Sequence, residues 1–120
     1  MIAPARLAAF RAMRSISAGR LDLASALARS RAGLDDDRDR ALLVELVTGT
    51  ERFRASLDHV LGQLSSRPLE QLDAAVLDIL RLGAYQLRHL TRVPASAVVD
   101  DAVNLATVSY THLTLPTILL

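Results

Sequence analysis

Residues 73–87 read DAAVLDILRLGAYQL, and this stretch decides the fold class. Asp73 is suited to cap the start of a helix, and apolar residues follow it on several sides of that helix. A helix with so little polar surface is expected at the centre of a helical bundle. Gly83 lies in its middle, where glycine costs about 1 kcal/mol relative to alanine, so we expect a close helix crossing there. Arg81 is expected to pair with a buried acid or a helix end, because an unpaired buried charge is costly.

Helical spacing continues on the N-terminal side of this stretch. A first helix is predicted from Pro4 to a stop near Gly19, and a second over about residues 21–30. Asp36 is expected to cap a third helix, whose apolar face continues over many turns. Gly49 is the expected place for a break in that helix or for a close crossing.

The C-terminal side also reads as helix. A short helical turn is predicted after Pro68, and a last helix is predicted to begin at Ala95. No strand pattern appears before Thr107. The sequence therefore predicts an all-α fold, a compact bundle of five to seven helices in one domain over residues 1–107.

Composition excludes several classes of protein. The chain has 120 residues, 51% of them apolar, with a net charge of +1 and no cysteine. These values exclude a polybasic tail, a disulfide scaffold, a thiolate zinc site and a cysteine nucleophile. The sequence has neither a His-x-x-x-His metal spacing nor a Gly-rich phosphate loop, so we expect no metal, no cofactor and no active site. A soluble cytoplasmic protein without a membrane span is expected, and the absence of Lys among the 14 basic residues suggests a GC-rich bacterial genome.

The last residues differ from the rest of the chain. Residues 109–120 carry no acidic, Lys or Arg side chain. Residues 108–112, VSYTH, match the translation of a transposon end used in sequencing libraries. We therefore predict that residues 108–120 are a non-native or disordered tail and that the domain is truncated near Thr107. The alternative is a genuine edge strand or docking peptide.

The first predicted helix carries an excess of positive charge. Four arginines precede Asp22, which is the first acid of the chain. Arginine next to an aromatic side chain can contact phosphates and stack on unpaired bases, although a solvated face is the simpler explanation. The residues predicted to contact RNA are Arg6, Phe10, Arg11, Arg14 and Arg20.

Four motifs in order resemble the NusB family. They are the helix at residues 5–16, DRDRAL with ELVTGT at 37–42 and 45–50, ILRLGAYQL at 79–87, and VP with VVDDAVNLA at 93–94 and 98–106. Within the family, the Tyr85-Gln86 pair is closer to the N-terminal domain of Sun-type (RsmB) 16S rRNA cytosine-C5 methyltransferases, because free-standing NusB proteins more often have Tyr-Glu. Asp101 stands where the family usually has Glu, and the family's final helix is missing.

This resemblance implies an RNA-binding domain that precedes an S-adenosylmethionine-dependent catalytic domain. The cysteine that such catalysis needs is absent, so this chain is not expected to be an enzyme itself. The leading hypothesis is the truncated RNA-binding domain of an rRNA methyltransferase, with rRNA as its partner. The alternatives are a transcription antitermination factor of the NusB type, which binds RNA with a ribosomal protein, and a helical protein-interaction module.

Overall fold

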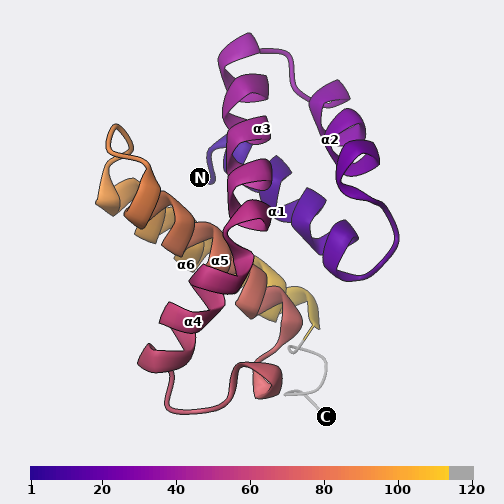
Figure 1. The fold of residues 1–120 in the computed structure, drawn as a ribbon. Coiled ribbons are helices and arrows are strands. Elements are labelled where there is room, and N and C mark those ends of the chain that lie inside the picture. Colours follow the sequence, from indigo (N-terminus) through magenta and orange to yellow (C-terminus); the bar gives the residue numbers. More distant parts are fainter. Residues whose placement is uncertain (114–120) are drawn as a thin grey trace.

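The computed structural model describes residues 1–113, with side chains through Ser109. This part of the chain forms six α-helices, one short 3-10 helix and no strand (Figure 1). The elements are α1 (Pro4–Ser17), α2 (Leu23–Ala32), α3 (Asp37–Arg52), α4 (Arg54–Leu64), η1 (Leu69–Gln71), α5 (Ala74–His89) and α6 (Ala95–Leu113). The prediction of an all-α bundle with five to seven helices is confirmed.

Aspartate side chains fix the starts of three helices. The Asp36 carboxylate accepts a hydrogen bond from the backbone N–H of Arg38 at 2.7 Å, and Asp73 accepts one from Ala75 at 2.9 Å. Both caps are as the sequence predicts. Asp22 caps α2 in the same way. Each carboxylate satisfies an N–H that the helix itself leaves free, and so it sets the residue at which the helix begins.

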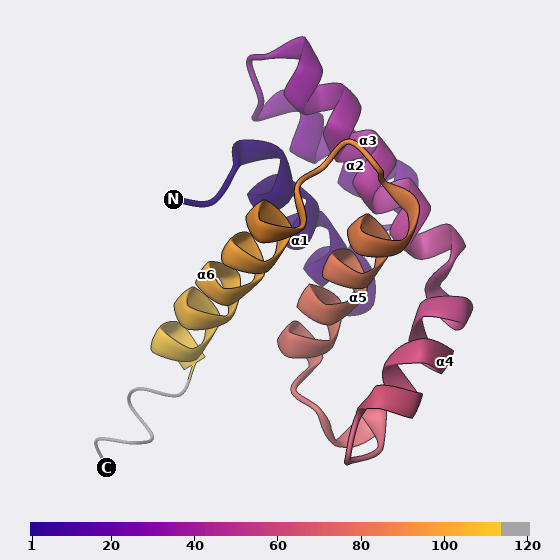
Figure 2. The same ribbon diagram turned by 90° about the vertical axis from the view of Figure 1, so that its left-hand side faces the viewer.

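Helix α5 is the centre of the bundle, as predicted. It packs against α1, α3, α4 and α6, and Figure 2 shows α6 running beside it in the opposite direction. Its inner side buries Ile79, Leu82 and Tyr85. Its burial is incomplete, because Leu80 is 39% and Leu87 is 53% exposed.

The long helix predicted after Asp36 is divided at Phe53 into α3 and α4. Phe53 ends the first and begins the second, and its ring stacks on His89 of α5 with the ring centroids 4.5 Å apart. Gly49 lies within α3 and marks a close crossing, which is one of the two outcomes predicted for it. A Cβ at Gly49 would overlap the phenol ring of Tyr85.

The prediction of a close helix crossing at Gly83 is wrong. A Cβ at that position would meet only Cγ1 of Val98, at 4.0 Å, which is ordinary van der Waals contact. A glycine within a helix leaves room for a neighbouring helix to approach. Whether one does approach depends on how all the helices of the bundle pack.

Arg81 holds α4 against α5. Its guanidinium donates to both carboxylate oxygens of Asp58 in α4, at 2.7 and 2.9 Å, and to Asp78 at 3.2 Å. Burial by itself lowers the pKa of Arg81, but the hydrogen bonds and charges of Asp58 and Asp78 outweigh it, so the pKa lies above its ordinary value. The prediction that Arg81 pairs with an acid is confirmed.

The predicted tail falls partly outside the described residues. Helix α6 continues through Leu113, past the expected boundary at residue 107, and residues 114–120 lie beyond the description. The non-native origin of residues 108–120 stays a prediction. None of the helices in the described part is both long and apolar enough to span a membrane.

Candidate nucleic-acid interface

The structure divides the five residues predicted to contact RNA into an inner and an outer group. Arg6 belongs to the inner group, because it is only 8% exposed. Its guanidinium donates to Oε1 of Gln86 at 2.7 Å and to Oδ2 of Asp101 at 2.9 Å. These bonds join α1 to α5 and α6, so the charge of Arg6 is neutralised inside the bundle.

Arg14 and Phe10 also face the protein. Arg14 donates to Asp78 of α5 at 2.8 Å, and the same carboxylate accepts from the Ser17 hydroxyl at 3.0 Å. Phe10 is half-buried and packs against the core. It stands about 100° around α1 from Arg11, so the two side chains leave the helix in different directions.

Arg11 and Arg20 form the outer group, and both are exposed. They line a groove of about 670 Å³ between α1 and α2. Arg29 of α2 lines the same groove from the opposite wall. The structure therefore brings two predicted residues together and adds a third arginine to them.

The turn between α1 and α2 sets the position of Arg20. Gly19 has a φ of +73°, a backbone conformation that residues other than glycine rarely adopt. The next N–H, that of Arg20, then donates to the carbonyl of Ser15 at 3.0 Å. Asp22 starts α2 by accepting from Ser25 at 2.7 Å. Two hydrogen bonds and one glycine thus fold the chain back at the turn, where Arg20 lines the groove.

The groove is positively charged. No acidic residue lines it among the residues that the structure describes. Within that part of the chain, Arg11, Arg20 and Arg29 also form no ion pair, unlike Arg6 and Arg14. Unpaired guanidinium groups around a concave surface attract phosphate and carboxylate groups.

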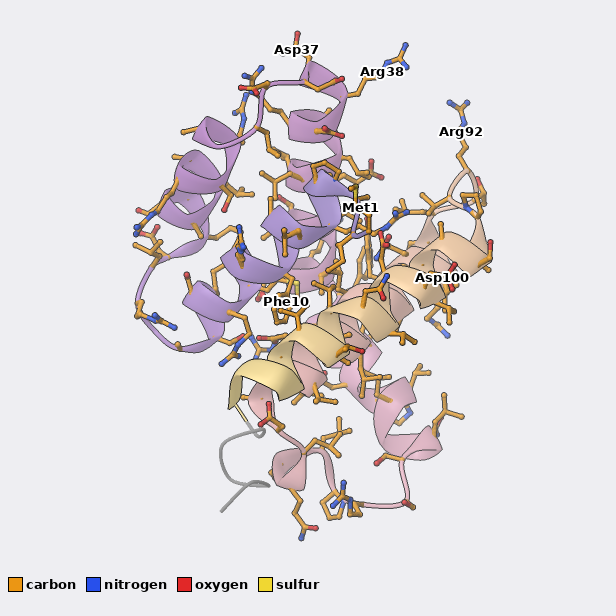
Figure 3. All side chains as sticks on the ribbon, turned by 180° about the vertical axis from the view of Figure 1, so that it is seen from behind. Met1, Phe10, Asp37, Arg38, Arg92 and Asp100 are labelled. Carbon is orange, nitrogen blue, oxygen red and sulfur yellow. The ribbon has the colours of Figure 1, made fainter. Side chains whose placement is uncertain are left out.

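Other hollows and arginines differ from this groove. The hollow beside the N-terminus, of about 580 Å³, is lined by Asp100, Asp101 and Arg6, and its arginine is already paired with Asp101. Arg38 and Arg92 point away from the rest of the molecule (Figure 3), and neither lines the α1–α2 groove. No cluster of three His, Cys, Asp or Glu side chains able to hold a metal occurs in residues 1–109, whose side chains the structure describes. The α1–α2 groove is therefore the strongest anion-binding candidate in the described part of the chain.

Sequence reasoning missed Arg29. It lies in the last turn of α2. A basic residue there stabilises the negative end of the helix dipole, so its presence is explained without any role in binding. The available signal was its place on the helix that directly follows Arg20. Arg29 lines the groove because of the angle at which α2 packs on α1. The sequence of neither helix alone determines that angle.

The comparison with known proteins gives the family. The NusB family matches residues 3–112.

The chain belongs to the NusB family.

Relatives of this NusB-family chain carry two kinds of name. Ribosomal RNA small subunit methyltransferase B of Pseudomonas putida is 41% identical over 84% of the chain, which spans 23% of that relative. Transcription antitermination protein NusB of Halorhodospira halophila is 45% identical over 62% of the chain, which spans 48% of it. The chain therefore spans less than half the length of these relatives, and the matched part is the NusB domain.

Proposed function

We propose that this NusB-family domain binds RNA through the groove between α1 and α2. The observation that carries the proposal is the set of three exposed arginines, Arg11, Arg20 and Arg29, around one groove without an acidic lining in the described residues. Arginine suits phosphate because its planar fork gives two parallel hydrogen bonds. Apolar side chains, among them Leu7 and Leu21, also line the groove, which suits a nucleic acid better than a small inorganic anion.

We further propose that the parent protein is a 16S rRNA cytosine-C5 methyltransferase and that this domain holds its rRNA substrate. The support is the extent of similarity: the methyltransferase of Pseudomonas putida matches 84% of the chain, whereas the NusB protein of Halorhodospira halophila matches 62%. Methyl transfer would belong to a separate catalytic domain, because the chemistry expected of it needs a cysteine thiolate and this sequence has none.

Two alternative functions predict different experimental results. An antitermination factor would bind RNA together with a ribosomal protein, and its gene would end in a stop codon instead of continuing into a cysteine-bearing methyltransferase domain. A helical protein-interaction module would bind no RNA at low salt. The gene sequence downstream separates the first alternative, and filter binding to rRNA fragments separates the second.

The decisive test replaces Arg11 and Arg20 together by alanine. We expect RNA affinity to fall by about 1–3 kcal/mol, because each lost phosphate contact removes its share of the electrostatic binding energy. The slope of log affinity against log salt should fall in magnitude by about 1.4–1.8, at roughly 0.7–0.9 for each contact. Filter binding to rRNA fragments over a series of salt concentrations measures both quantities.

Arg38→Ala with Arg92→Ala is the matched control, since it removes the same charge from exposed positions outside the groove. We expect it to change the affinity much less. Equal losses in the two double variants would contradict the groove as the RNA surface, provided that circular dichroism shows both variants to be folded.

A further inference from the structure

The floor of the α1–α2 groove differs chemically from its rim. The floor includes Leu7, Ala8 and Leu21, which are half-buried, whereas the rim carries the exposed arginines. Apolar surface gives nothing to a phosphate group, so a ligand that only neutralised the arginines would leave this floor exposed to water. The groove therefore fits a ligand with a flat, weakly polar part next to an anionic part.

The size of the groove agrees with such a ligand. Its volume of about 670 Å³ lies within the range of pockets that hold whole small molecules, roughly 300–1,000 Å³. Two serines, Ser15 on α1 and Ser30 on α2, line the groove beside the apolar floor. Their hydroxyls can each donate and accept hydrogen bonds, which matches the edge of a nucleobase.

We infer that the groove takes one unstacked nucleotide of the bound RNA, with its base on the apolar floor and its flanking phosphates on Arg11, Arg20 and Arg29. The inference rests on the proposed RNA binding and names the part of the RNA that enters the groove. A base inside a duplex is stacked and paired, so it cannot reach the floor, whereas the phosphates of a duplex can still reach the rim.

The test compares three probes of about 12 nucleotides: a single strand, the same sequence as a duplex, and a strand of equal charge that lacks its bases. We expect the intact single strand to bind about tenfold more tightly than either of the others, as one stacked base contributes. Fluorescence anisotropy over a series of salt concentrations gives all three affinities and their salt dependence. The affinities are compared by extrapolation to high salt, because the duplex carries more phosphates than the single strand.

Ala8→Leu fills the floor of the groove while it leaves all three arginines in place, and it adds no aromatic ring on which a base could stack. We expect this variant to bind the single strand about as weakly as the baseless strand, with an unchanged salt dependence. Ser30→Leu, which fills the groove from α2, should do the same and covers the case in which Ala8→Leu does not fold. Ala28→Leu is the control, because Ala28 is exposed on α2 outside the groove.

The outcomes separate the two proposals. If the unchanged chain binds none of the probes, RNA binding itself fails. If it binds all three equally, or if the folded filling variants keep the preference for the intact single strand, the nucleotide inference fails while RNA binding stands. Loss of the preference in a folded filling variant, but not in Ala28→Leu, supports the inference.

Discussion

At Gly49 a single missing side chain lets two helices meet. The ring of Tyr85 occupies the space that a Cβ would fill. We expect Gly49→Ala to lower the free energy of unfolding by about 1–3 kcal/mol, because the ring or the helix must move to admit the methyl group. Urea denaturation followed by circular dichroism measures the change.

Gly62→Ala provides the comparison. Gly62 lies in α4, and beyond the adjoining residues and the backbone of its own helix no heavy atom lies within 4 Å of the added Cβ, so the substitution adds helix propensity and no clash. It should raise the free energy of unfolding by roughly 0.5–1 kcal/mol. If both substitutions shift stability in the same direction and by the same amount, the close packing of Gly49 against Tyr85 is contradicted.

The three glycines Gly49, Gly62 and Gly83 look alike in the sequence, since each follows helical spacing. Only Gly49 has a neighbour that excludes a methyl group. The sequence shows at which glycines another helix could approach closely. It does not show at which of them a neighbouring side chain occupies the free space. This depends on the positions of all the helices at once.

At the scale of the helices, one buried acid fastens α6 to the rest of the bundle. Asp101 is 6% exposed and accepts hydrogen bonds from the Arg6 guanidinium and from the backbone N–H of Ala3, at 2.9 and 3.2 Å. We expect Asp101→Ala to destabilise the domain by about 3–5 kcal/mol, because it leaves the buried Arg6 charge unpaired. Thermal or chemical denaturation of the purified variant checks this.

The neighbouring residue is the natural control. Asp100 is exposed and is in no ion pair within the described part of the chain. Asp100→Ala should therefore change the free energy of unfolding by less than about 0.5 kcal/mol. Similar effects of the two substitutions would show that the pair between α1 and α6 contributes little.

Helix starts were readable from the sequence because their signals are local. Asp36 and Asp73 each act on an N–H two residues away. The arginines of α1 could not be sorted in this way. Arg6 finds Asp101 at a separation of 95 residues, and Arg14 finds Asp78 at 64. A helix considered alone shows which arginines share a side, but not which side meets an acid.

At the scale of the whole molecule, α5 and α6 leave apolar side chains uncovered. These helices pack against each other, and the exposed fractions of Leu80, Leu87, Val99 and Val103 lie between 39% and 58%. Exposed apolar surface of this kind favours association between molecules. The described chain is therefore expected to self-associate as its concentration rises.

Replacing Leu87 and Val103 together by serine should reduce this association. Both side chains are more than half exposed, so little core packing is lost and the melting temperature should change little. Light scattering over a range of concentrations, with a thermal melt, measures the two effects. Unchanged scattering would contradict an associating α5–α6 surface, and a large fall in melting temperature would mean that these residues stabilise the fold.

The ion pair between Arg6 and Asp101 also imposes an order on the folding of the chain during its synthesis. Arg6 is among the first residues to leave the ribosome, and its partner follows 95 residues later. At about 5–20 residues per second, Arg6 therefore waits roughly 5–20 seconds for Asp101. During that interval α1 has an uncompensated charge on the side that it will later bury. The N-terminal helix therefore takes its final place, and the domain closes, only after the beginning of α6 has emerged.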